Sequence, residues 1–282
     1  VIGAEPVAHP SPGDGAAPGT TPDSGSSNTG ASGGASQGGA GTAGIGAAGG
    51  VAPQSPPAAA IVPGQIVAAG TIRNDGGRIY AGDVKLQTPN IDNSGGTLSV
   101  GELQVSGPRF SNAGGTLNVA RRFDARVGSF NNAGGTLNTG SLQIATDSAV
   151  GNGALDNTAG ALRSNGDLQL QVGGDLLNAG ADISSAGTLN ATVLGQVENT
   201  GGQMLANQQL ALNAADLDNT GGIVGTGEGA LDLRTQGQTR NVGGKLLAGG
   251  VLRLQNVGLD NTSGQAVGQG VSVQSGNGAL VT

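Results

Sequence analysis

The stretch Leu217-Asp-Asn-Thr-Gly-Gly-Ile-Val224 contains a short motif, Asn-x-Gly-Gly-x-apolar, that returns along most of the chain. Its ten copies, some with one substitution, begin at Asn74, Asn93, Asn112, Asn132, Asn157, Asn178, Asn199, Asn219, Asn241 and Asn261. Successive copies lie 19, 19, 20, 25, 21, 21, 20, 22 and 20 residues apart. A near-constant period of this length is the signature of a repeat architecture. The longest interval contains residues 146–153, which we expect to form an inserted loop.

Apolar residues keep nearly fixed positions relative to each motif Asn. They lie two residues before it, five after it, and as a pair near eleven and thirteen after it. Around Asn199 these residues are Val197, Met204, Leu210 and Leu212. A pair spaced by two places both side chains on one face of a β-strand, and no stretch shows sustained helical spacing. The pattern therefore predicts three short strands per repeat and no helix.

Repeats of this kind describe the coils of a β-solenoid. One coil cannot bury its few aliphatic side chains alone, so coils stack at about 4.8 Å and pair their strands in parallel. We expect an all-β fold of about ten coils over residues 66–282, with a narrow core that includes Leu210, Leu212, Leu252 and Leu254. Phe110 and Phe130 share one position in neighbouring coils and should stack, whereas Tyr80 follows the inward Ile79 and should point outward.

The Asn and Gly residues of the motif fit sharp corners. Both residue types tolerate positive φ at the least cost. An Asn amide also carries a donor and an acceptor, so amides stacked coil on coil can form a hydrogen-bonded ladder along the axis. We interpret the ten Asn residues as a structural corner row. A row of ligand-binding amides is the alternative.

Composition excludes several classes of function. Gly accounts for 57 of 282 residues, aromatic residues for 1%, and there is no Cys and one His. These counts argue against an aromatic-rich globular core, thiol chemistry, cysteine-ligated metals and histidine-based catalytic triads. Glu198 and Asp218 should be neighbours, which is compatible with a cation site, but Arg240 follows in the same row and favours solvated, paired charges instead. The acids are too scattered for a glycosidase-type pair, so we expect no enzyme activity, no metal site and no cofactor.

The N-terminal segment differs in composition from the repeats. Nine of the 11 prolines precede residue 64, among Gly, Ala, Ser and Thr, which predicts a disordered linker over residues 1–65. No Lys, strand or helix pattern accompanies these glycines, which excludes a phosphate-binding loop. The chain starts at Val1 without a signal peptide and ends within a repeat, so we expect a piece of a longer array whose C-terminal end is open and associates end to end.

The chain is acidic overall but contains one cluster of basic residues. The formal net charge is −7, which disfavours nucleic-acid binding, and no apolar run is long enough for a membrane helix. Four arginines are clustered in the sequence, namely Arg109, Arg121, Arg122 and Arg126. They form either a solvated edge or a patch for a sulfated glycan or another anionic surface.

The repeats resemble the haemagglutinin repeats of filamentous haemagglutinin-type exoproteins. The resemblance covers about residues 66–282 and is carried by Leu217-Asp-Asn-Thr-Gly-Gly-Ile223, by Leu259-Asp-Asn-Thr-Ser-Gly-Gln265 and by Leu246-Leu-Ala-Gly-Gly-Val-Leu-Arg-Leu254. It implies a right-handed parallel β-helix, export through an outer-membrane partner of a two-partner secretion system, and a place outside a Gram-negative cell.

The resemblance also implies a function. The expected role is the shaft of a filamentous adhesin, which carries a binding or effector tip toward a receptor or glycan on a host or bacterial cell. Two alternatives stay open: the stalk of a contact-dependent growth-inhibition toxin carrier, and a segment that itself binds a glycan or receptor. Val197-Glu-Asn-Thr200 resembles the Val-Glu-Asn-Asn junction of the toxin carriers without matching it.

Overall fold

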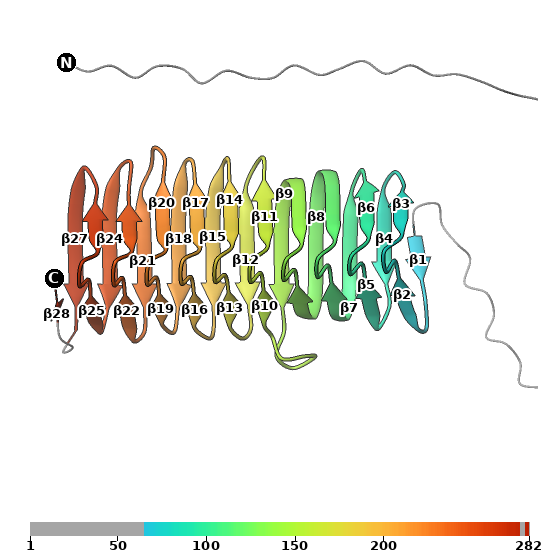
Figure 1. Ribbon diagram of the computed structural model, residues 1–282, viewed down its shortest axis with the longest axis horizontal. Coiled ribbons are helices and arrows are strands. Elements are labelled where there is room, and N and C mark those ends of the chain that lie inside the picture. The colour runs from blue at the N-terminus through green and yellow to red at the C-terminus, as the bar shows by residue number, and fades with distance from the viewer. Residues whose placement is uncertain (1–64, 277–279, 282) are drawn as a thin grey trace, which may run out of the picture. The chain divides into compact units, whose positions relative to one another are not determined.

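A computed structural model describes residues 65–276 and 280–281, which form 28 β-strands and no helix. The predicted linker, residues 1–65, lies outside the described part except for Gln65. Successive strands wind into about ten stacked coils, so that the solenoid presents three faces (Figure 1). The fold is the all-β parallel solenoid expected from the repeat pattern.

The faces are named here by their place in the coil. Face A precedes each corner Asn and contains β2 (Thr71–Arg73), β5 (Asn90–Asp92), β10 (Leu155–Asp156), β13 (Leu176–Leu177), β16 (Val197–Glu198), β19 (Leu217–Asp218), β22 (Gln238–Arg240), β25 (Gly258–Asp260) and β28 (Leu280–Val281). Face B follows the corner and contains β3 (Arg78–Tyr80), β6 (Thr97–Val100), β11 (Ala161–Ser164), β14 (Asp182–Ser185), β17 (Gln203–Ala206), β20 (Ile223–Thr226), β23 (Lys245–Leu247) and β26 (Gln265–Val267). Face C completes the coil and contains β1 (Gln65–Val67), β4 (Val84–Gln87), β12 (Leu168–Val172), β15 (Thr188–Val193), β18 (Gln209–Ala214), β21 (Leu231–Thr235), β24 (Val251–Asn256) and β27 (Gly270–Ser275).

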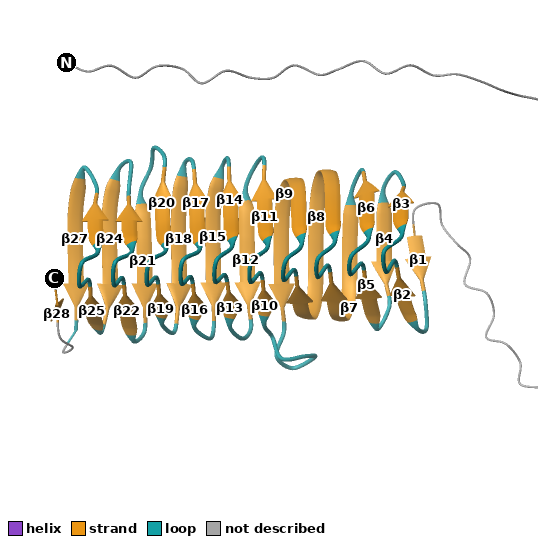
Figure 2. Cartoon of the chain, viewed as in Figure 1, coloured by secondary structure: helices purple, strands orange, loops and turns teal. Residues whose placement is uncertain are grey.

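Three strands are longer than the repeat pattern predicts. They run around corners without a break and belong to more than one face, namely β7 (Leu103–Ser111), β8 (Thr116–Asn131) and β9 (Thr136–Thr146) (Figure 2). The expectation of three short strands per coil is therefore wrong for these coils. In these strands the backbone pairing with the neighbouring coil continues through the corners next to face C, so the chain stays extended there. The pairing of β8 with β9 shifts in register between Val119 and Arg122.

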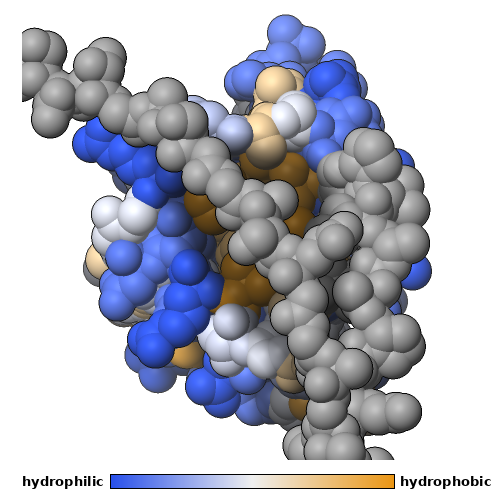
Figure 3. Space-filling view, turned by 90° about the vertical axis from the view of Figure 1, so that its right-hand side faces the viewer, coloured by the Kyte–Doolittle hydropathy of each residue, from blue (hydrophilic) through white to orange (hydrophobic). Residues whose placement is uncertain are grey.

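Every strand pairs in parallel with the equivalent strand of a neighbouring coil, and inward residues stack on inward residues. Leu189, Leu210, Leu231 and Leu252 are successive Cα partners on face C. Because inward and outward side chains alternate, the inward rows form one apolar column along the axis. Figure 3 looks at the N-terminal end of the solenoid and shows apolar residues at the centre with hydrophilic residues around them.

The expected core is confirmed at its leucines and phenylalanines. Leu210, Leu212, Leu252 and Leu254 are at most 2% exposed. The Phe110 and Phe130 rings stack with centroids 4.9 Å apart, and Phe123 joins them at 5.9 and 6.0 Å, a third ring that the repeat pattern did not pair with them. This aromatic cluster lies within the long strands β7 and β8.

The first described coil departs from the expected burial. Tyr80 points outward as expected and is 70% exposed. Ile79 stacks on Leu98 in the inward row, yet it is 37% exposed rather than buried. The difference arises because β3 pairs on one side only, with β6, so no described strand covers the other side of Ile79.

A charge in the core tests the inward register. Leu212→Asp should destabilise the solenoid by at least about 4 kcal/mol, because it places an unpaired charge in an apolar column. Leu212→Ala should cost about 2–5 kcal/mol through the cavity alone. Urea unfolding followed by circular dichroism measures both changes.

The neighbouring residue provides the control for this test. Asn213 is exposed on the outer side of the same strand, so Asn213→Asp should leave the unfolding midpoint within experimental error. Equal loss in Leu212→Asp and Asn213→Asp would show that the strand is not held in this register.

Candidate functional site

The ten corner Asn side chains form one continuous hydrogen-bonded row. The Nδ2 atom of each donates to the Oδ1 atom of the next, over nine bonds of 2.6–2.8 Å. The eight inner members, from Asn93 to Asn241, are at most 1% exposed. Buried amides of this kind must be satisfied within the protein, so the row serves the stack and offers no accessible atoms to a ligand.

Each of the first nine amides also donates to a backbone carbonyl of the following coil. Asn199 Nδ2, for example, lies 2.7 Å from Asn219 Oδ1 and 3.2 Å from the carbonyl oxygen of Ile223. The backbone of each corner adds a further bond, because the N–H of the second motif glycine donates to the Asn carbonyl, as Gly222 does to Asn219 at 3.0 Å. Side chain and backbone therefore fix the corner together.

The two glycines of the motif are required for different physical reasons. The first, represented by Gly201, has a φ of 62°, a conformation that costs an L-residue about 1–2 kcal/mol. Two corners carry another residue there, Ala159 with φ 53° and Ser263 with φ 55°. The second glycine leaves room for the preceding coil, since a Cβ on Gly222 would overlap the carbonyl oxygen of Asn199.

A second polar row, which the sequence analysis did not identify, closes the corner between faces B and C. Ser164 and Ser185 are buried and donate from their hydroxyls to the carbonyls of Asp167 and Thr188, each at 2.9 Å. Thr226 repeats the contact at 2.7 Å. All three residues lie seven positions after a corner Asn, and this recurring Ser/Thr spacing was the signal in the sequence.

The acidic residues beside the corners serve as turn acceptors and ion-pair partners. Glu198 and Asp218 are Cα partners in adjacent coils as expected, and Arg240 approaches Asp218 at 4.0 Å. Asp218 also accepts from the backbone N–H of Thr220 at 2.9 Å. Among the described residues, no group of three or more His, Cys, Asp or Glu side chains is placed to hold a metal ion.

The structure separates the four clustered arginines. Arg109 lies on face A, whereas Arg121, Arg122 and Arg126 lie on face C or at the corner before it. Arg121 pairs with Asp83 at 2.5 Å and Glu102 at 3.1 Å. Arg122 and Arg126 both approach Asp124, at 3.3 and 3.6 Å. An anionic ligand at these three side chains would compete with carboxylates, and a binding role for the four residues stays a prediction.

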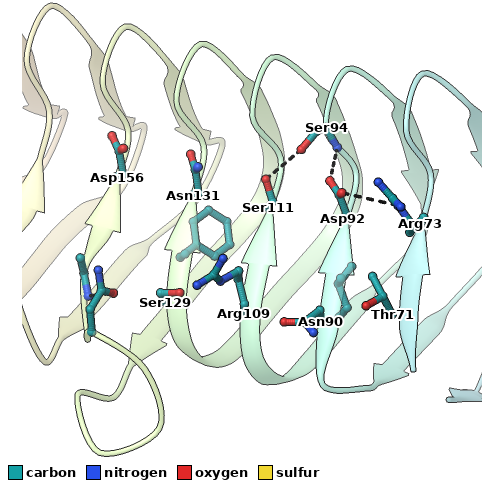
Figure 4. A pocket seen from close by; sticks show the side chains of 14 residues that line it. Thr71, Arg73, Asn90, Asp92, Ser94, Arg109, Ser111, Ser129, Asn131 and Asp156 are labelled. Atoms are coloured by element: carbon teal, nitrogen blue, oxygen red, sulfur yellow. Dashed lines mark hydrogen bonds and ion pairs between the residues drawn. The ribbon is translucent and has the colours of Figure 1, made fainter. Parts of the chain in front are cut away.

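Arg109 lines a groove with a volume of about 610 Å³ on the described solenoid (Figure 4). The groove runs along face A across β2, β5, β7, β8 and the segment that leads into β10. Most of its lining side chains carry hydroxyl, amide, carboxylate or guanidinium groups, namely Thr71, Arg73, Asn90, Asp92, Ser94, Arg109, Ser111, Ser129, Asn131, Asn152 and Asp156. This groove is the candidate binding site of the chain.

The inserted loop borders the groove. It occupies residues 147–154, between β9 and β10, and projects from the corner between faces C and A (Figure 1). Asn152 and Ala154 line the face A groove, while Asp147 and Val150 line a smaller hollow on face C. The sequence located this insertion, but nothing in the repeat pattern indicated a groove beside it.

A stack of in-register parallel coils with an apolar interior and polar outer faces defines the class of protein as a parallel β-solenoid. Within this class the chain belongs to the haemagglutinin repeat family, whose model matches residues 64–160, 139–201, 184–243 and 226–282. No curated relative and no solved structure matches the chain. Within the described residues, no helix has the length and apolarity needed to cross a membrane.

The amide row is tested by an isosteric substitution. Asn199→Asp keeps an acceptor toward Asn178 but faces the Asn219 oxygen without a donor, so it should destabilise the protein by about 1–3 kcal/mol. Asn190→Asp on the exposed outer side of face C adds the same charge and should change little. Thermal unfolding of both variants measures the difference, and matching melting curves would contradict a structural role for the row.

The positive-φ corners give a second test with opposite signs. Ala159→Gly should raise stability by about 0.5–1 kcal/mol, because relief of the αL strain exceeds the entropy cost of glycine. Gly201→Ala should lower it by about 1 kcal/mol, and Gly222→Ala by more, because of the overlap with Asn199. Urea unfolding gives the order of the three variants, and a loss of stability in Ala159→Gly would contradict the strain argument.

Acid titration tests the turn beside the last corner. The Thr262 hydroxyl at 2.7 Å and the Thr262 N–H at 3.1 Å lower the pKa of Asp260. A lowered folded-state pKa contributes stability above the unfolded pKa, and that stability is lost as the pH falls through the folded value. Thr262→Val should move the Asp260 pKa back toward its ordinary range in an NMR titration, while Thr262→Ser should not. An unchanged pKa in Thr262→Val would contradict the assignment.

Proposed function

We propose that this chain is a shaft segment of a large secreted or cell-surface adhesin. Haemagglutinin repeats in a β-solenoid are a structural, adhesin-type element, and membership of this family supports the proposal. The observation that carries it is that neighbouring coils are joined by the same contacts all along the solenoid. The same three parallel pairings and the same amide bond recur from coil to coil, so length grows with the number of repeats, to roughly 45–50 Å for ten coils.

A shaft also has to resist bending, and the contacts between coils support this property. Each coil is joined to the next by backbone hydrogen bonds on three faces, by the buried amide row and by the apolar column. These contacts lie on different sides of the axis, so bending in any direction strains one of them. A chain held in this way can keep a distant domain away from a surface.

The family context extends the proposal beyond the chain itself. Haemagglutinin repeats imply two-partner secretion, so an outer-membrane transporter is the partner we propose for export from a Gram-negative cell. The shaft would then present a binding or effector domain to a receptor or glycan on a host or bacterial cell. Supporting features are the polar outer faces and the family match over residues 64–282.

Removal of one complete coil tests the shaft. Deletion of residues 178–198 joins Leu177 to Asn199, removes β14, β15 and β16, and keeps the core and amide rows in register. Small-angle X-ray scattering should show a rod shorter by about 5 Å with the same cross-section. The control removes only residues 188–198, which takes away the face C strand β15 and the face A strand β16 but leaves β14, and it should unfold the neighbouring coils. A changed cross-section in the full-coil deletion, or a stable half-coil deletion, would contradict the proposal.

A further inference from the structure

The face A groove has the dimensions of a site for an extended ligand. Its lining residues come from five successive coils, from Thr71 before the first corner to Asp156 before the fifth. At about 4.8 Å per coil the groove is roughly 20 Å long, which is longer than a single sugar ring or a small organic acid. Its volume of about 610 Å³ falls in the usual range for ligand sites.

One of the arginines that line the groove has no carboxylate partner among the described residues and is available to an anionic ligand. Two arginines and two aspartates line it, so the groove as a whole is formally neutral. Arg73 approaches Asp92 at 4.0 Å, and Asp156 accepts from the Thr158 N–H at 2.9 Å. Within residues 65–276, Arg109 has no carboxylate within 4.0 Å, and its guanidinium extends from β7 toward Ser129 (Figure 4).

Neutral hydrogen-bonding groups flank this arginine on both sides. Asn90 and Ser129 are its Cα partners in the preceding and following coils, so the three side chains form one outward row. The side chains of Asn90 and Ser129 form no hydrogen bond with other described residues, which leaves their amide and hydroxyl groups to a ligand. The row therefore offers a guanidinium fork between two uncharged hydrogen-bonding groups.

This geometry selects the class of ligand. Around Arg109 the face A strands β5, β7 and β8 are each paired on both sides, so a peptide cannot bind beside this arginine by adding a strand. A guanidinium binds a planar carboxylate through two parallel hydrogen bonds, and amides and hydroxyls bind sugar hydroxyls. A formally neutral groove gives no long-range attraction to a densely charged polyanion.

We propose that the face A groove binds an acidic glycan through a sugar carboxylate. Arg109 holds the carboxylate, and Asn90 and Ser129 bind hydroxyls on either side of it. The carboxylate belongs to a uronic acid or to a sialic acid, which share this chemistry. The inference goes beyond the shaft role and does not depend on it, because it concerns outward side chains that the stacking of coils does not use.

Binding of defined oligosaccharides to the full chain tests the proposal. The probes are an oligogalacturonate, sialyllactose, maltohexaose as the neutral glycan, and dextran sulfate as a dense polyanion without carboxylates. Isothermal titration calorimetry should show binding of at least one carboxylate glycan and at least tenfold weaker binding of maltohexaose and dextran sulfate. The comparison of oligogalacturonate with sialyllactose identifies the source of the carboxylate.

Three variants separate the groove from general surface charge. Arg109→Gln should weaken carboxylate binding at least tenfold, and Arg109→Lys should recover only part of it, because lysine keeps the charge without the fork. The control is Arg163→Gln on face B, where Arg163 pairs with Asp182 at 2.8 Å, and it should bind as the parent does. Circular dichroism verifies that each variant is folded.

The proposal is overturned by any of three results. These are no binding of either carboxylate glycan at millimolar concentration, unchanged affinity in Arg109→Gln, and equal losses in Arg109→Gln and Arg163→Gln. Preference for dextran sulfate would likewise overturn it and would assign recognition to net charge. None of these results bears on the coil deletion, so the shaft proposal stands or fails separately.

Discussion

The hydrogen bond from one buried Asn amide to the next is the constraint on which the rest of the solenoid depends. All nine bonds run in the same direction, so each inner Asn both donates and accepts. A slip of one residue in any coil would leave buried amides unpaired and would turn the core leucines outward. The row therefore fixes the register of the three faces at once.

The same constraint determines where the chain is free to vary. Inward positions must fill a narrow column and corner positions must keep the amide row, but outward positions only have to remain soluble. The insertion of residues 147–154 lies at the corner between faces C and A, where it interrupts neither the Asn corner nor face B. Arg109, Asn90 and Ser129 likewise occupy outward positions on face A. A binding site can therefore be built on a shaft without weakening it.

The repeat pattern predicted the coils, the core and the corner row, because each depends on a fixed spacing that the sequence displays directly. It did not predict the long strands β7, β8 and β9, since strand ends depend on how sharply each corner bends. It also did not predict that Arg121 lies in one column with Asp83 and Glu102 and pairs with both, because that requires the exact alignment of three coils. The groove could not be predicted from the sequence because it also depends on how the coils align. It forms where small side chains, such as Ser129 and Ala154, lie beside longer ones in neighbouring coils.

One corner shows which interaction yields when two requirements conflict. Ala181 replaces the second motif glycine, where a Cβ points at the preceding coil. The bond from the Ala181 N–H to the Asn178 carbonyl lengthens to 3.3 Å, against 2.8–3.1 Å at the other corners. The side-chain bonds of the row remain at 2.8 Å from Asn157 to Asn178 and 2.7 Å from Asn178 to Asn199. The turn bond therefore lengthens while the bonds of the amide row keep their length. The turn bond lies within one coil, whereas a broken bond in the row would leave buried polar groups unpaired in two coils.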